Sequence, residues 1–190
     1  MLRLTVLALT MLAAASPQDM LTLEIRVFDR DKDVTGQTRV TVHVAGDRGA
    51  PVGQIAGKDP RAPMRVPPGF YDAQAVHLRD GKVVNIRWAE RLVVMPYPDE
   101  GGHHLQVINL ATGFGALQIR PESPLETGDT IALVGAGGQE HAAAAHGQHG
   151  YVLFVVPAGM YDLQVVRGGR TVWHRDMEIP LDRTRFLVVP

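Results

Sequence analysis

The chain has no cysteine and only two serines among its 190 residues. Without cysteine it can form no disulfide, no thiolate nucleophile and no cysteine-ligated metal site. The serines are Ser16 and Ser123, and neither lies in the glycine-flanked turn that presents a catalytic serine. A His-Glu-x-x-His motif and a phosphate-binding glycine loop are missing as well. These absences argue against an enzyme, and the sequence predicts no cofactor.

Strong charge of either sign is also missing. Lys and Arg number 19 against 20 Asp and Glu, which leaves a formal net charge of −1. A nucleic acid or an anionic membrane surface is therefore not an expected partner. A hydrophobic content of 45% with 21% charged residues is typical of a globular protein.

The N-terminus has the features of a secretory signal peptide. A single charge at Arg3 precedes the apolar run from 4 to 14, and the small residues 13–15 fit a cleavage site. The run is too short to span a bilayer, so we expect no membrane span. The sequence thus predicts a signal peptide over residues 1–15 and an exported protein, either periplasmic or secreted.

One eleven-residue segment occurs twice. Residues 66–76 and 156–166 share seven of their eleven positions, including Pro, Gly and the Tyr-Asp pair. A repeat of this length predicts a duplicated domain. In each copy Pro-x-Gly predicts a type II turn, with positive φ at Gly69 and Gly159. The alternating residues that follow predict a strand with its tyrosine, Tyr71 or Tyr161, in the core.

A hairpin and a return strand follow each copy of the segment. Asp80-Gly81 and Gly168-Gly169 predict two-residue type I′ turns. The return strands carry the two tryptophans, Trp88 and Trp173, whose alternation with later apolar residues predicts burial in the core. A polar position interrupts each strand, at Glu90 and Arg175, and indicates a β-bulge.

The whole pattern predicts an all-β protein. Each copy contains five to seven short strands separated by Gly, Pro and Asp turns, which favours a β-sandwich. We expect a first domain over residues 16–110 and a second over 111–190. The pattern breaks at 109–115, and so short a linker predicts that the domains touch.

The repeated Val-Pro-x-Gly-x-Tyr-Asp-x-Gln-x-Val motif with its glycine hairpin resembles the extracytoplasmic modules of the carboxypeptidase regulatory-like and PEGA type. This resemblance implies two tandem Ig-like or transthyretin-like β-sandwiches after the signal peptide. It also implies that the Pro, Gly and Tyr of the motif are framework residues, because members of these families are usually non-catalytic modules.

Histidines cluster in the stretch from 135 to 150. His141, His146 and His149 are the candidate metal ligands, for zinc or copper of weak affinity. Their spacing does not prearrange a site, because residues five apart on a helix point in different directions. The alternative is an exposed Ala/Gly/His loop.

These observations predict an exported, non-catalytic binding or accessory protein whose partner is a protein or a cell-envelope component. The alternative is a metal- or carbohydrate-binding protein that uses the histidine-rich loop or an exposed tryptophan face.

Overall fold

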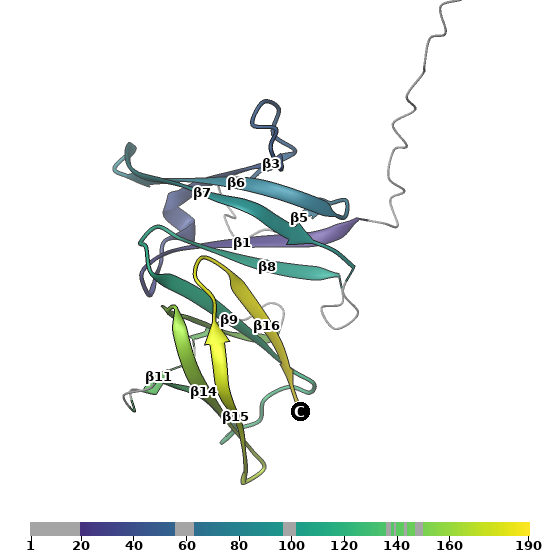
Figure 1. The fold of residues 1–190 in the computed structure, drawn as a ribbon, viewed down its shortest axis with the longest axis vertical. Helices are drawn as coiled ribbons and strands as arrows, with labels where there is room; N and C mark the ends of the chain where they lie inside the picture. The colour runs from purple at the N-terminus through teal and green to yellow at the C-terminus, as the bar shows by residue number, and fades with distance from the viewer. Residues whose placement is uncertain are drawn as a thin grey trace, which may run out of the picture.

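The computed structural model describes residues 20–55, 63–96, 102–135, 138, 140–142, 144–146 and 150–190. The expected signal peptide, residues 1–15, lies outside the described residues. Among the described residues, no helix has the length and hydrophobicity that a membrane crossing needs. The described residues form an all-β protein of four four-stranded sheets, so the predicted fold class is confirmed (Figure 1).

The first half of the chain, up to residue 110, forms two of these sheets. One sheet has β1 at its centre, paired with β2 and β5 on one side and with β8 on the other. The other has the order β4-β3-β6-β7. The strands are β1 (Leu21–Asp29), β2 (Lys32–Asp33), β3 (Thr38–Val44), β4 (Gly53–Ile55), β5 (Met64–Val66), β6 (Gly69–Arg79), β7 (Lys82–Val94) and β8 (His103–Asn109), with a 3-10 turn at Thr35–Gln37.

The second half, from residue 111, also forms two sheets. Their orders are β12-β13-β9-β16 and β11-β10-β14-β15. The strands are β9 (Phe114–Pro121), β10 (Thr130–Gly135), β11 (Glu140–Ala142), β12 (Ala144–His146), β13 (Tyr151–Pro157), β14 (Gly159–Arg167), β15 (Arg170–Ile179) and β16 (Thr184–Val189). The first strand of each half runs parallel to the last one, β1 beside β8 and β9 beside β16.

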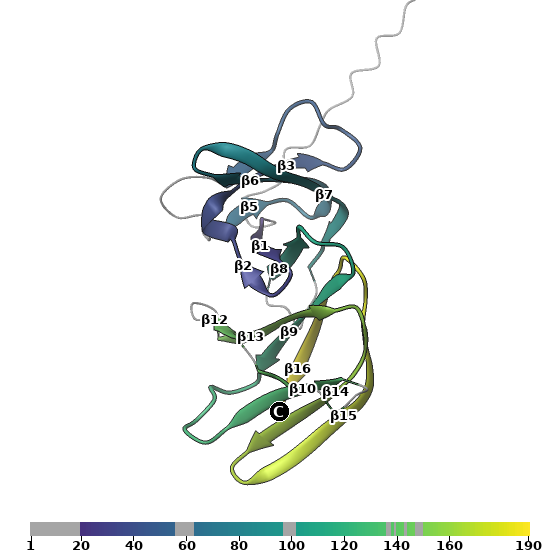
Figure 2. The same cartoon turned by 90° about the vertical axis from the view of Figure 1, so that its left-hand side faces the viewer.

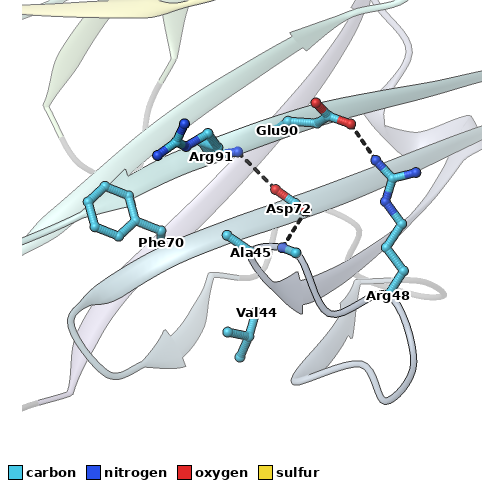
Figure 3. A pocket seen from close by; sticks show the side chains of 8 residues that line it. Val44, Ala45, Arg48, Phe70, Asp72, Glu90 and Arg91 are labelled. Carbon is cyan, nitrogen blue, oxygen red and sulfur yellow. Dashed lines mark hydrogen bonds and ion pairs between the residues drawn. The ribbon is translucent and has the colours of Figure 1, made fainter.

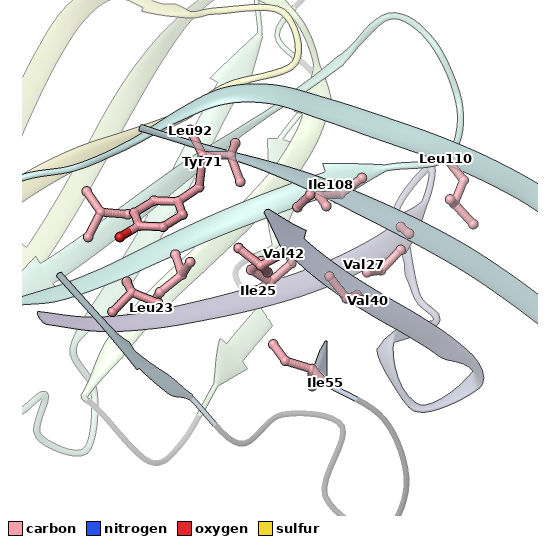
Figure 4. Packing of buried hydrophobic residues seen from close by; sticks show 14 of the residues in the cluster. Leu23, Ile25, Val27, Val40, Val42, Ile55, Tyr71, Leu92, Ile108 and Leu110 are labelled. Atoms are coloured by element: carbon pink, nitrogen blue, oxygen red, sulfur yellow. The ribbon is translucent and has the colours of Figure 1, made fainter. Parts of the chain in front are cut away.

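Each half has its own apolar core between its two sheets. The first core contains the inward residues of β1, β3, β6 and β7, among them Leu23, Val42 and Tyr71 (Figure 4). The second contains their counterparts, such as Leu117, Leu133 and Tyr161. Both motif tyrosines are buried as predicted, and each hydroxyl donates to the carbonyl four residues earlier, at 2.6 and 2.7 Å. This contact fixes the turn before the strand, as a tyrosine corner does.

The turn itself differs from the prediction. Neither Gly69 nor Gly159 has a positive φ, so the type II turn is wrong. Each glycine is instead the first residue of a strand, β6 or β14, and a Cβ at Gly69 would lie 3.5 Å from the ring of Tyr71. The tyrosine side chain thus folds back along the glycine, which accounts for the Gly-x-Tyr spacing without left-handed backbone.

The two hairpins match the prediction. Asp80 and Gly81 both have positive φ, at 51° and 75°, and so do Gly168 and Gly169, at 52° and 76°. These are the values that a type I′ turn requires at its two central positions. The predicted bulges are present too, where the register shifts opposite Asp72 and Asp162.

A third apolar cluster joins the halves. It contains Phe28 of β1, Leu105 and Val107 of β8, and Ala116, Tyr151 and Leu153 of β9 and β13. The sheet of β1 and β8 therefore packs its outer face on the outer face of the sheet of β9 and β13 (Figure 2). The halves touch, as the short linker implies. Gly115, the neighbour of Ala116, faces the inside of the second half, where a Cβ would clash with the Pro180 carbonyl oxygen.

The interface between the halves also buries a polar network. The hydroxyl of Tyr151 donates to Glu24 at 2.8 Å, and the imidazole of His103 lies 3.0 Å from the other carboxylate oxygen. Arg26, 3% exposed, forms an ion pair with Asp33 and lies 3.6 Å from Glu24. Buried charges are stable only when they are paired. This network therefore holds the second half against the outer face of β1.

The pKa values in this network reflect the pairing. Burial alone would raise the pKa of Glu24, but hydrogen bonds from His103 and Tyr151 hold that pKa below its usual value. Burial would likewise raise the pKa of Asp33, and Thr35 and Arg26 lower it instead. Burial together with the neighbouring Glu24 raises the pKa of the Tyr151 hydroxyl. The network therefore stabilises the charged forms of Glu24 and Asp33 and the neutral form of Tyr151.

A second contact between the halves covers part of β7. Arg87 pairs with Asp182 at 2.6 Å, and Arg183 donates to the carbonyl oxygens of Glu90 and Arg91 at 3.4 and 3.3 Å. These contacts satisfy backbone groups on the outer edge of β7, a strand that pairs only with β6 among the described residues.

The buried network predicts a large effect for Arg26→Met. Removing the guanidinium leaves Glu24 and Asp33 without their buried counter-charge, so the free energy of unfolding should fall by about 3–5 kcal/mol. The control is Arg39→Met, because Arg39 is an exposed arginine on β3. Its replacement should change the free energy of unfolding by about 0.5 kcal/mol or less, as for ordinary surface substitutions. Equal losses in urea denaturation would contradict the role of the network.

Candidate functional site

The bulge in β7 organises the outer face of the β4-β3-β6-β7 sheet. Glu90 and Arg91 both lie opposite Asp72, and Arg91 has a φ of 55°. The Asp72 carboxylate accepts the Arg91 amide at 2.9 Å and the Gly46 amide at 3.0 Å. These two backbone hydrogen bonds lower the pKa of Asp72. Each carboxylate oxygen of Asp72 thus accepts a backbone amide, and the side chain holds the bulge and the start of the β3–β4 loop in place.

A hollow of about 750 Å³ lies over this bulge (Figure 3). Phe70 and Val44 line it, and each side chain is 49% exposed. Arg48 forms an ion pair with Glu90 on one side, and the guanidinium of Arg91 lies beside Phe70 on the other. Among the described residues, Arg91 has no ion-pair partner. The hollow therefore offers an apolar ring and an available cation next to each other.

The tryptophans lie on the outer faces of their sheets, so the predicted burial in the core is wrong. Trp88 is opposite Gln74 and half-buried, whereas Leu92 is opposite the inward Tyr71. The bulge between them adds one residue, so the residues before it and after it alternate out of step. The alternation of Trp88 with Leu92 therefore does not place the indole in the core. Trp173 is 39% exposed for the same reason.

An arginine covers each indole. The guanidinium carbon of Arg48 is 4.3 Å from the ring centroid of Trp88, and that of Arg175 is 4.1 Å from the ring centroid of Trp173. Distances this short are typical of cation–π contacts. The ring of His43 lies near the first indole as well, with 5.7 Å between centroids.

The second half has an equivalent bulge with opposite charges. Arg175 and Asp176 lie opposite Asp162, and Asp176 has a φ of 53°. Asp162 accepts the Asp176 amide at 3.0 Å and forms an ion pair with Arg175. Where the first bulge has an acid followed by a cation, the second has a cation followed by an acid.

The candidate metal ligands lie on two different sheets or outside the described residues. His141 is opposite Leu133 in the sheet of β10, and His146 is opposite Tyr151 in the sheet of β13. His149 lies outside the described residues. Among the described residues, no group of three or more His, Cys, Asp or Glu side chains could hold a metal ion.

The metal site therefore stays a prediction. Titration of the protein with zinc, compared with a variant in which His141, His146 and His149 are replaced by Gln, measures it directly. The expected result is weak, non-saturating binding that the variant loses. A stoichiometric site of sub-micromolar affinity would contradict it.

Phe70 and Arg91 were not among the residues that sequence reasoning selected. The sequence contains one signal. Phe70 alternates with Asp72 and Gln74, so the motif places a phenyl ring on the polar face of the strand. Arg91 directly follows the predicted bulge position, but nothing in the sequence shows that it lines the same hollow as Phe70.

Comparison with protein-family models and with curated proteins gave no match. Among solved structures, the TIE protein of Bacillus anthracis is 17% identical with a TM-score of 0.33, and the match covers 88% of this chain and 33% of that one. A tip fimbrial protein of Porphyromonas gingivalis is 10% identical with a TM-score of 0.28, over 82% and 81%. A minor pilin of Streptococcus agalactiae is 10% identical with a TM-score of 0.29, over 89% and 94%. At this level of similarity, what those proteins do does not transfer to this chain.

The outer-face position of the tryptophans predicts quenching by solvent. In a Trp88→Phe variant the remaining Trp173, 39% exposed, should be quenched readily by acrylamide and emit at long wavelength. In a Trp173→Phe variant the half-buried Trp88 should be quenched less. Blue-shifted emission with weak quenching in both variants would place the indoles in the core after all.

Proposed function

We propose that the protein is an exported, non-catalytic binding module built from two tandem copies of one β-sandwich. The copies span residues 16–110 and 111–190. The equivalent strand orders, the two tyrosine contacts and the two bulges support a duplication. In this proposal residues 1–15 are the signal peptide and the mature protein acts in the periplasm or outside the cell.

The proposed binding site is the hollow on the outer face of the first half. The observation that carries it is an exposed Phe70 beside an available Arg91, over a carboxylate that is already satisfied. Aromatic and arginine side chains are the residues that contribute most to protein interfaces. Phe70 offers an apolar contact and Arg91 a positive charge, whereas the Asp72 carboxylate already accepts two backbone amides. The hollow is therefore suited to recognition of a protein or another envelope component.

Carbohydrate binding is the second candidate, and the exposure of Trp173 favours it. An exposed indole can stack on a sugar ring, but Arg175 covers one face of this one. A sugar would therefore use the open face or displace the arginine. A change in Trp173 fluorescence on addition of cell-wall sugars, in the Trp88→Phe variant, measures this activity.

Capture from the native envelope tests the main proposal. Immobilised protein is incubated with an envelope extract, and bound components are quantified by mass spectrometry. Phe70→Ser should lower the capture of the specific component about tenfold or more, because a central aromatic contact contributes about 2 kcal/mol. Leu125→Ser is the matched control, since Leu125 is an exposed aliphatic residue on the β9–β10 loop.

The expected result is a component whose capture depends on Phe70 and not on Leu125. Equal capture by both variants would contradict a binding site in the hollow. Similar melting curves of the two variants ensure that lost capture is not lost folding.

A further inference from the structure

The four sheets are stacked so that two outer faces remain uncovered by the other half. Apolar clusters lie between the two sheets of each half, and the third cluster lies between the halves. The outer face of the β4-β3-β6-β7 sheet and the outer face of the β11-β10-β14-β15 sheet are therefore at opposite ends of the stack (Figures 1 and 2). We refer to them as the first and the second outer face.

Both outer faces expose large apolar side chains. On the first face Phe70 and Ile86 are 49% and 53% exposed. On the second face Met160 and Trp173 are 49% and 39% exposed. Phe70 and Met160 occupy the same place, one residue after the glycine that begins the strand. Both faces thus present an exposed apolar side chain at the same place beside the bulge.

The bulges on the edge strands β7 and β15 carry opposite charges. Arg91 and Asp176 occupy equivalent positions in the two bulges, and neither has an ion-pair partner among the described residues. Their neighbours are already paired, Glu90 with Arg48 and Arg175 with Asp162. The first face thus has an available cation where the second has an available carboxylate.

We propose that the protein associates head to tail with further copies of itself, the first outer face of one copy on the second outer face of the next. In this contact Arg91 pairs with Asp176 of the next copy, and Phe70 packs beside Met160. The proposal rests on the proposed function, because it names a partner for the same hollow.

The charges favour this arrangement over a symmetric dimer. A symmetric contact that joined the bulges of two first faces would bring Arg91 against Arg91, and one that joined the bulges of two second faces would bring Asp176 against Asp176. Like charges placed together oppose association. A contact between two different faces at opposite ends of a molecule does not close on itself as a dimer, and its repetition gives open chains.

Sedimentation velocity of the whole mature protein tests the proposal. The wild type should form dimers and longer species as its concentration rises, and less so at high salt, because salt screens exposed charges. Arg91→Glu and Asp176→Arg should each raise the concentration needed for association at least about tenfold, since each places like charges in the contact. Glu122→Lys, on the exposed β9–β10 loop, is the charge-change control and should behave as the wild type.

Mixing the two single variants gives the sharpest result. The Arg91→Glu variant carries a carboxylate on its first face, and the Asp176→Arg variant carries a guanidinium on its second face. These two altered faces have opposite charges and can pair. The unaltered second face of the first variant and the unaltered first face of the other keep their native charges and can pair as well. An equimolar mixture should therefore recover association that neither variant shows alone. Melting curves confirm that each variant is folded, which matters because both positions have positive φ.

The outcomes separate this inference from the proposed function. A wild type that stays monomeric at all concentrations, or a mixture of folded variants that stays monomeric, overturns head-to-tail association. If Phe70→Ser still lowers capture of another envelope component in that case, the binding site stands and only the partner is wrong. If Phe70→Ser changes neither capture nor association, both proposals fail.

Discussion

The buried network of Glu24, Arg26 and Tyr151 is the interaction on which the arrangement of the halves depends. β1 lies between two packed surfaces, with Leu23 and Ile25 in the first core and Glu24 and Arg26 against the second half. A charged pair on an otherwise apolar face would be exposed to water if the second half moved away. Instead Tyr151 donates to Glu24 from the other half, so pairing of the charges and contact of the halves occur together.

This constraint decides which surfaces are left for binding. The sheets of β1 and β9 use both of their faces, one for a core and one for the contact between the halves. Among the described residues, the outer faces of the other two sheets are the ones that carry these bulges, together with the exposed Phe70, Met160 and Trp173. The two halves therefore share an internal contact and present two outward faces. Their different charges follow from a few residues at the bulges, and the framework acids Asp72 and Asp162 are the same in both.

Much of the framework could be predicted from local sequence, whereas the site could not. Asp80-Gly81 and Gly168-Gly169 require only backbone preferences, and the prediction of their turns is confirmed. Trp88 was misplaced because one extra residue in a strand reverses every later side chain, and periodicity does not show where the pairing shifts. Glu24 and Arg26 resemble the solvent face of an ordinary strand in the sequence, because Tyr151, which covers them from the other half, is 127 residues from Glu24 in the chain. Arg91 and Phe70 line one hollow because β6 and β7 pair with the bulge between them.

A double-mutant cycle across the contact of the halves tests the central claim most directly. Glu24→Gln, Tyr151→Phe and the double variant are compared with the wild type by urea denaturation. The account predicts a coupling free energy of about 1 kcal/mol or more, because the two side chains share a buried hydrogen bond of 2.8 Å between the halves. Free energies that add within about 0.3 kcal/mol would show that the two residues act independently, and would contradict a network that holds the halves together.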